Sequence, residues 1–380
     1  MMTEYLYDDV VSGTFIRREN RFIVCANIDG SLVVCHMPNP GRMRELLFPG
    51  VTVYAIKNNN PINRTDYRII GVEREKEVIL LDTARCNDVA HYLIDHQKIK
   101  GWEDHRVVKK EVTMGDSRFD LLLRSQTTGE EFPVEVKSCT LFGKKGAMFP
   151  DAVTSRGKKH IIHLGEMGRA GHAGLLILVH WSRAEWFLPD FHTDIEFAEA
   201  FRKNASYIDL KVAGIHWEAD FRYPEKARLL PVPISILDKE MGNHGDYLLC
   251  LFLEQDKDIE VGCRGIMHFP AGHYVYVGSA KRNLQQRMDR HKHLRKKMHW
   301  HIDYLRQHTK YIGIIPIRTS HDWEHELAAA VRDISDWQID RFGCTDCKCM
   351  SHLFGFHENP LHLKAFTKIE EEFEINRLNE

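Results

Sequence analysis

The first 85 residues hold a regular succession of short apolar segments separated by turn signals. The segments are "GTFIRREN", "RFIVCANI", "SLVVCHM", "VTVYAI" and "DYRIIGVE", and the turn signals between them are "IDG", "PNPG", "FPG" and "NNNP". Strands this short leave their edges exposed unless they pair, and closure into a barrel removes the edges altogether. The pattern therefore predicts a small barrel or sandwich over residues 1–85.

The next part of the chain alternates helical and strand patterns. We predict a helix over 86–98, three strands within 106–138, a helix closed by glycine over 155–171 and a buried strand over 173–181. The turn "TTGE" (127–130) predicts a hairpin between the last two of the three strands. This order indicates an α/β domain over 86–228.

The composition changes again near residue 229. "LLPVPISILDKEMGNHGD" has two prolines and two glycines, and it predicts a linker over 229–242. A second module then runs from 243 to 360 and is followed by a charged tail, 361–380. A length of 380 residues with 43% apolar residues fits a multidomain α/β protein with several cores.

The net charge and the cysteine content limit which binding partners and which cellular compartment we expect. The formal net charge is −2, so a nucleic-acid surface must come from local basic patches. No apolar run approaches the roughly 20 residues that span a bilayer, and the start "MMTEYLYDDV" is unlike a secretion signal. Nine cysteines, most of them scattered singly, fit a reducing cytoplasm. We therefore expect a cytoplasmic protein without a membrane partner.

The strand "FPVEVKSCT" (132–140) carries two opposite charges on one face. Alternate residues of a strand share a face, so Glu135 and Lys137 point the same way. If residues 118–123 pair with this strand, Asp120 can meet Glu135. Two converging carboxylates suit Mg²⁺ or Mn²⁺, and the lysine could attend the water or phosphate. A solvated Glu–Lys pair is the alternative, and spacing alone favours it.

Several motifs favour the metal-site interpretation over the solvated ion pair. "GTFIRRENRF", "HMPNPGRMRELLFPG", "FDLLL", "VEVKSCTL" and "AMFPDAVTSRGKKH" together resemble the sugar fermentation stimulation protein A (SfsA) family. The resemblance implies an N-terminal OB-like barrel, a PD-(D/E)XK nuclease-like α/β domain and DNA binding. It also implies that Asp120 is the core acid and that Glu135 and Lys137 form the E-x-K half.

Basic residues near these motifs predict a surface for DNA. Arginine forks match phosphate oxygens, and a helix N-terminus favours phosphate. Each residue alone is more simply a solvated cation, but the cluster is a stronger indication than its members. The predicted set is Arg17, Arg18, Arg21, Arg42, Arg44, Arg156, Lys158 and Lys159.

The C-terminal module offers a second candidate site. "HYVYVGSAKRNLQQRMDRH" (273–291) places Tyr276 on a strand, with Arg287 and His291 on one face of the following helix. "HELAAAV" (325–331) puts Glu326 early in a helical run. The glutamate could bind a metal, the arginine could steady a phosphate and a tyrosine could orient water. Ordinary core aromatics and surface charges are the alternative.

Here too the motifs resemble a family. "GDYLLCLFL", "AGHYVYVGSA", "LQQRMDRH", "MHWHIDYL" and "FGCTDCKCMSHLF" look like the GIY-YIG-like family once labelled as a domain of unknown function. The resemblance implies an α/β nuclease-like fold. It assigns Tyr247 and Tyr276 to the two half-motifs, and Arg287, His291 and Glu326 to the arginine, second helical residue and metal glutamate.

The stretch "CTDCKCMSH" gathers four soft side chains in nine residues. Cys344, Cys347, Cys349 and His352 could hold a structural zinc ion tetrahedrally. The loop is short, however, and buried thiols in a tight turn remain the alternative. The two modules together predict a DNA-binding protein that is a Mg²⁺- or Mn²⁺-dependent nuclease, or a non-cleaving regulatory protein that keeps nuclease folds.

Overall fold

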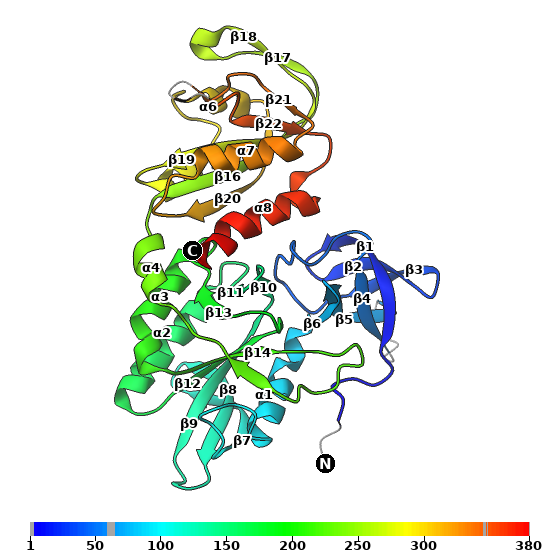
Figure 1. Cartoon of the computed structure of the whole chain (residues 1–380), viewed down its shortest axis with the longest axis vertical. Helices are drawn as coiled ribbons and strands as arrows, with labels where there is room; N and C mark the ends of the chain where they lie inside the picture. The colour runs from blue at the N-terminus through cyan, green and yellow to red at the C-terminus, as the bar shows by residue number, and fades with distance from the viewer. Residues whose placement is uncertain (1–3, 59–64, 345–346, 348, 380) are drawn as a thin grey trace. The chain divides into compact units, whose positions relative to one another are not determined.

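The computed structural model describes residues 4–58, 65–344, 347 and 349–379. The chain divides into two compact units, Met1–Ile234 and Ser235–Leu378 (Figure 1). The boundary falls within the interval 229–242, but part of that interval is helical, because α4 spans Ser235–Glu240. Within the described ranges, no helix is long and apolar enough to cross a membrane.

The N-terminal part of the first unit is a closed barrel, as the strand pattern predicts. β3 pairs with β2 on one side and with β5 on the other, where Cys35 lies opposite Tyr67, and this second pairing closes the ring. The strands are β1 (Val11–Asn20), β2 (Ile23–Ile28), β3 (Ser31–His36), β4 (Thr52–Lys57), β5 (Tyr67–Arg74) and the appended β6 (Glu77–Leu80).

A mixed six-stranded sheet forms the rest of the first unit, in the order β15-β14-β12-β9-β8-β7. Its strands are β7 (His105–Met114), β8 (Ser117–Ser125), β9 (Glu131–Cys139), β12 (Gly174–Val179), β14 (Asp209–Ile215) and β15 (Ala227–Leu229). A small second sheet holds β10 (Leu141–Phe142), β11 (Gly146–Phe149) and β13 (Trp186–Pro189). The helices are α1 (Cys86–Asp95), α2 (Ser155–Ala170) and α3 (Ile195–Asn204).

Both faces of the six-stranded sheet are covered by helices. Along the fully buried β12, Leu175 and Ile177 join the core that includes α2 and α3, whereas Leu176 joins the core that includes α1. Figure 1 shows α2 and α3 together on one face of the sheet. Burial on both faces explains why this strand reads as a continuous apolar run.

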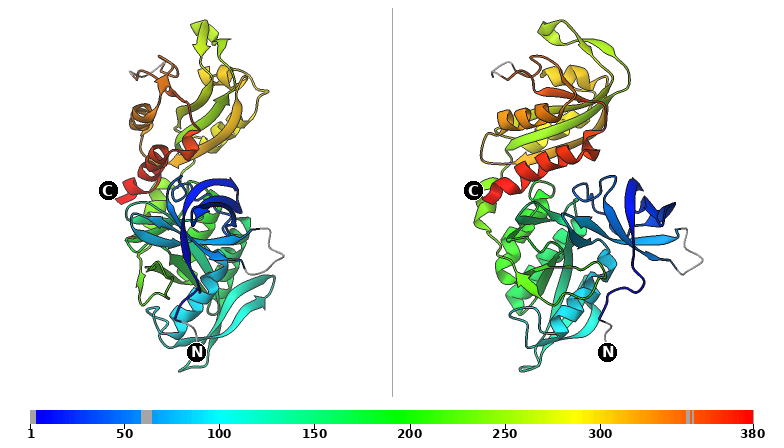
Figure 2. Two further views of the ribbon diagram at one scale, coloured as in Figure 1. Left: turned by 90° about the vertical axis from the view of Figure 1, so that its right-hand side faces the viewer. Right: turned by 45° about the vertical axis from the view of Figure 1, so that its right-hand side comes forward.

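The second unit is an antiparallel sheet in the order β20-β16-β19-β22-β21. Its cores contain α5 and α6 on one face and α7 and α8 on the other. In the left view of Figure 2, the orange α7 and the red α8 lie on the same side of this sheet. The strands are β16 (Gly245–Leu253), β17 (Lys257–Glu260), β18 (Ile266–Phe269), β19 (Gly272–Ala280), β20 (Lys310–Arg318), β21 (Trp337–Gln338) and β22 (Leu353–Phe356). The helices are α5 (Leu284–Lys292), α6 (His301–Arg306), α7 (Glu324–Ile334) and α8 (Lys364–Glu374).

A buried carboxylate joins the barrel to the sheet domain. Asp82 is fully buried at the start of the 3-10 turn Thr83–Arg85 that leads into α1. It accepts hydrogen bonds from the Tyr7 hydroxyl at 2.8 Å and from the Ala84 amide at 3.2 Å. It also pairs with Arg68 on β5. One carboxylate therefore fixes the N-terminal segment, a barrel strand and the entry to α1.

We predict that Asp82→Ala destabilises the first unit by about 2–3 kcal/mol, because the buried Tyr7 hydroxyl and the partly exposed Arg68 lose their acceptor. Hydrogen exchange in β5 and β6 measures this loss. Glu225→Ala, at an exposed position, is the control. Equal protection in the two variants would contradict this role of Asp82.

Candidate functional sites

The pairing of β8 with β9 places two predicted acids side by side. The strands are antiparallel, with Leu121 opposite Val134, and the next position along this register sets Asp120 opposite Glu135. The regular pairing ends at Leu121 and Val134, and beyond it the Val136 amide donates to the Asp120 carboxylate at 2.8 Å. The structure thus brings the acids together where the two strands separate.

Glu135 is the buried centre of this first site. One of its oxygens, Oε1, contacts Lys137 from the same strand and Nδ1 of His160 from α2, the latter at 2.5 Å. The other oxygen, Oε2, is buried and accepts no hydrogen bond from any residue the structure describes. Glu135 therefore keeps one oxygen, Oε2, open as a ligand atom, while its other oxygen is bound by Lys137 and His160.

The second acid, Asp120, is held by donors from α1 and β9. Asp120 Oδ1 accepts a hydrogen bond from the Asn87 side chain of α1 at 2.9 Å, and Oδ2 accepts the Val136 amide. These two donors fix the carboxylate and leave each oxygen a further lone pair. Asn87 and His160 belong to the site, although neither is part of the predicted acid and E-x-K motif.

The two carboxyl groups have opposite pKa shifts. Burial raises the pKa of Asp120, and the nearby charge of Glu135 raises it further. Burial also works to raise the pKa of Glu135, but the hydrogen bond from His160 and the charge of Lys137 outweigh it, so the pKa of Glu135 is lowered. The repulsion between the acids is the kind that a divalent cation between them would relieve.

The predicted basic residues of the barrel are mostly engaged. Arg18 donates to the carbonyl groups of residues 39, 41 and 42, and this clamps the "PNPG" loop. Arg17 pairs with the exposed Glu19, Arg21 lies over the Phe22 ring and Arg42 reaches the Thr193 hydroxyl at 3.1 Å. Arg44 is partly buried. Arg18 therefore serves the loop rather than an open phosphate surface.

The basic residues of α2 lie nearer to the acids. Arg156 is exposed, and its Nε donates to Nε2 of His160 at 3.5 Å, on the side of the ring away from Glu135. Lys159 is also exposed and reaches the Asp116 carbonyl at 3.4 Å. Lys158 pairs with Glu196 at 2.8 Å, which neutralises its charge. Among the basic residues of α2, Arg156 is therefore the one that contacts a residue of the first site, and Lys159 is a second exposed cation on the same helix.

The second unit brings its two predicted tyrosines together. Tyr247 on β16 and Tyr276 on β19 have ring centroids 6.3 Å apart, and the Tyr247 hydroxyl hydrogen-bonds Nε2 of His291 at 2.8 Å. A Cβ at Gly278 would stand 2.5 Å from the Tyr247 ring, so only glycine leaves room for this packing. The "YVG" half-motif thus makes space for the tyrosine of the other half-motif.

Ser279 connects the arginine to a glutamate. Its carbonyl accepts a hydrogen bond from Arg287, and its hydroxyl donates to Oε2 of Glu324 at 2.7 Å. Arg287 also lies over the Trp300 ring at 4.4 Å, with Arg290 over the same ring at 4.9 Å. The tryptophan therefore helps to hold the arginine near the tyrosines.

The glutamate in this position is Glu324, whereas the sequence motif predicted Glu326. Glu326 is exposed, and no hydrogen bond or ion pair of its side chain occurs within the described part of the chain. Glu324 precedes the buried Leu327, Ala328 and Val331 by three, four and seven residues, so the helical period turns it toward the sheet. That period was readable from the sequence and could have identified it.

The aromatic and imidazole groups of this second site are uncharged near neutral pH. Burial raises the pKa of the Tyr247 and Tyr276 phenols, and the charge of Glu324 raises both further. Burial, together with the positive charge of Lys296, lowers the pKa of His291 to about 3. The tyrosines are therefore suited to orient a water molecule or a phosphate by hydrogen bonding, rather than to act as phenolate bases.

A cavity of about 410 Å³ opens beside Ser279. Its wall includes Lys281, His321 and the buried Asp246 of the first half-motif. Burial raises the pKa of Asp246 to about 7, although the Trp323 amide donates to it. Ser279, which donates to Glu324, is the residue that this cavity shares with the second site.

The cysteine-rich stretch forms a third group of side chains. Cys347, Cys349 and His352 come together as the sequence predicted, but the fourth member is His325 of α7. Cys344 is outside this group, and its thiol contacts the Phe342 carbonyl at 3.5 Å.

Three segments of the chain match known families. Residues 16–81 match the SfsA N-terminal OB domain, residues 84–220 match the sugar fermentation stimulation protein RE domain and residues 246–375 match the domain of unknown function DUF123. The first two matches lie in the first unit and the third lies in the second unit.

Individual relatives cover the first unit. The sugar fermentation stimulation protein homolog of Methanothermobacter thermautotrophicus is 35% identical over 204 residues, which cover 53% of this chain and 84% of that protein. The homolog of Pyrobaculum arsenaticum is 42% identical over 189 residues, which cover 50% of this chain and 79% of that protein. The structure of Pyrococcus furiosus SfsA in complex with Ca²⁺ superposes with a TM-score of 0.55 at 25% identity, covering 61% of this chain and 99% of that one.

The buried Asp246 yields a prediction about pH. Its folded-state pKa of about 7 lies above the unfolded value, so its contribution to stability is full below about pH 4 and is lost as the pH rises through 7. We expect Asp246→Asn to stabilise the second unit relative to the parent, increasingly from pH 4 to 7 and by at most about 4 kcal/mol above pH 7. Hydrogen exchange in β16 at several pH values measures this difference.

Glu358→Gln provides the control, because Glu358 is an exposed carboxylate of the same unit. A stability difference for Asp246→Asn that does not change between pH 4 and pH 8 would contradict the proposed titration.

Proposed function

The chain belongs to the sugar fermentation stimulation protein family, as its motifs predicted, and on that premise we propose that it binds DNA and hydrolyses phosphodiester bonds with a divalent metal ion. The observation that carries this proposal is the open oxygen of Glu135. Oε2 is buried without a hydrogen-bond donor, next to an Asp120 whose pKa is raised by Glu135 itself.

The donor set at this first site fits Mg²⁺ or Mn²⁺. Both ions take carboxylate oxygens and complete their shells with water, and the Pyrococcus furiosus relative was solved with Ca²⁺, another oxygen-binding ion. A bound ion would stabilise negative charge on the phosphate and lower the pKa of a water molecule.

The residues around the acids have separate tasks in this proposal. His160 and Lys137 hold Oε1 of Glu135, which leaves Oε2 as the atom that would bind the ion. Lys137 is only slightly exposed, and its ammonium stands at the site to counter charge that grows on the phosphate. Asn87 and the Val136 amide orient Asp120 in the same way.

The second site supports a second phosphodiesterase centre in the same chain. Glu324 would bind the metal, Arg287 would contact the phosphate, and the neutral Tyr247 and Tyr276 would orient the attacking water. Ser279 supports this arrangement, because it links Glu324 to Arg287 through one residue.

A DNA-binding regulatory protein that does not cleave is the other function to test. The contacts of Glu135 favour it in one respect, because Lys137 and His160 already counter the carboxylate charge without a metal. Binding and cleavage must therefore be measured separately.

We expect the purified full chain to cut labelled DNA in the presence of Mg²⁺ or Mn²⁺ and not in chelator. Duplex, single-stranded and branched substrates should all be tried. Glu135→Gln removes the metal-binding charge at the first site, and Glu324→Gln removes it at the second. Loss of one such group should lower the cleavage rate at its own site by about 100-fold or more.

Matched variants distinguish the sites. Glu225→Gln is the exposed control for the first unit, and Glu326→Gln lies one residue beyond His325 on α7 and controls for Glu324. Activity lost in Glu326→Gln but kept in Glu324→Gln would support the glutamate expected from sequence. DNA binding without cleavage under either metal ion would leave the regulatory function.

The salt dependence of DNA binding tests whether the basic residues of α2 contact phosphate groups. Each phosphate contact adds about one to the slope of log K against log salt concentration. We expect Arg156→Ala and Lys159→Ala each to reduce this slope, and Lys158→Ala to leave it unchanged, because Lys158 is paired with Glu196. Equal slopes in all three variants would place the DNA on another surface.

A further inference from the structure

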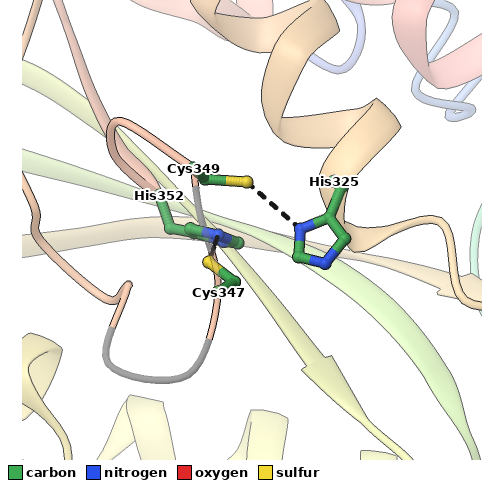
Figure 3. Close-up of side chains that lie close together, drawn as sticks. All are labelled: His325, Cys347, Cys349 and His352. Carbon is green, nitrogen blue, oxygen red and sulfur yellow. Dashed lines mark hydrogen bonds between the residues drawn. The ribbon is translucent and has the colours of Figure 1, made fainter.

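Four soft side chains converge at the edge of the second unit. His325 comes from the first turn of α7, and Cys347, Cys349 and His352 precede or adjoin β22 (Figure 3). One ligand atom from each residue lies within 4.8 Å of the other three. None of these four residues is one of the carboxylates of the proposed phosphodiesterase sites.

The separations are close to those of a tetrahedral zinc site. Cys347 Sγ lies 3.3 Å from Nε2 of His352, and Cys349 Sγ lies 3.1 Å from Nδ1 of His325. Zinc–sulfur and zinc–nitrogen bonds of about 2.3 and 2.0–2.1 Å would set such atoms about 3.5 Å apart. Two thiolates and two imidazoles are also a usual ligand set for structural zinc.

A short cysteine loop need not supply all four ligands, because α7 contributes His325. A site made from residues 344–352 alone would draw all its ligands from one loop, whereas His325 supplies a ligand from a separate element. Cys344 is not one of the four residues whose ligand atoms lie within 4.8 Å of one another, although its thiol is close enough to Cys347 to form a hydrogen bond. A bound ion would therefore cross-link the loop before β22 to the first turn of α7.

His352 faces two groups with its two nitrogens. Nε2 points to Cys347, and Nδ1 lies 3.5 Å from Oε1 of Glu324. His352 is almost fully buried, so its ring has little freedom. Metal-bound histidines commonly direct their second nitrogen to a carboxylate, which fixes the orientation of both groups.

We propose that His325, Cys347, Cys349 and His352 bind one zinc ion, and that this ion positions Glu324 through His352 and through the adjacent His325. The zinc site goes beyond the proposed hydrolysis, whereas its effect on Glu324 rests on the proposed role of that glutamate. The zinc ion is structural, because four protein ligands fill a tetrahedral shell.

Metal content tests the zinc site without reference to activity. We expect the full chain, purified under reducing conditions, to hold one equivalent of zinc, and Co²⁺ exchanged into it to give the visible spectrum of a tetrahedral ion with thiolate ligands. His325→Ala, Cys347→Ser and Cys349→Ser should lose the ion. Cys344→Ser and the exposed Cys263→Ser should keep it.

Two results would overturn the site. The first is a parent protein that holds no zinc after purification and gives no tetrahedral cobalt spectrum, which would leave hydrogen-bonded thiols in a turn. The second is loss of the ion in Cys344→Ser with retention in His325→Ala, which would restore the set expected from sequence.

The positioning of Glu324 needs a further readout. Removing zinc should increase hydrogen exchange in the first turn of α7 and in β22, and zinc, but not Mg²⁺, should reverse this. His325→Cys should restore both zinc and protection that His325→Ala loses. A protein that binds zinc without any change at α7 would exclude the positioning role, whereas absent DNA cleavage with intact zinc effects would refute only the proposed hydrolysis.

Discussion

The charge of Glu135, buried within an apolar sheet, is the constraint around which the first unit's site is arranged. A carboxylate in such a place is costly unless it is paired and hydrogen-bonded. Lys137 of the same strand and His160 of α2 offset this cost, and both contact the same oxygen, Oε1. The second oxygen, left without a donor, gives the site its capacity for a cation.

The same constraint shapes the second unit with different residues. Glu324 is only partly exposed, and it is held by Ser279 and faced by His352. In the same unit, the hydroxyl of Tyr247 on β16 forms a hydrogen bond with Nε2 of His291 on α5. In both units a carboxylate is thus held between a strand and a helix: Glu135 lies on β9 and is held by His160 of α2, whereas Glu324 lies on α7 and is held by Ser279 of β19. The two folds nevertheless differ in topology.

Local patterns predicted much of the fold because they depend on neighbours in sequence. The turn signals between short strands predicted the barrel, and the apolar run near residue 175 predicted the buried β12. The strand period likewise placed Glu135 and Lys137 on one face, where they form an ion pair. The prediction was weaker where an apolar pattern is short, as in α4, which forms inside the predicted linker.

The sequence by itself determined the strand-rich barrel, the alternation of the α/β domain and the residue types able to bind metal and phosphate, because all of these follow from short-range periodicity and side-chain chemistry. Tertiary structure decided which residues meet. It brought His160 to Glu135, Glu324 rather than Glu326 to Ser279, and His325 to the cysteines. These contacts join segments that are distant along the chain, and their geometry depends on how helices pack on a sheet, which no local pattern specifies.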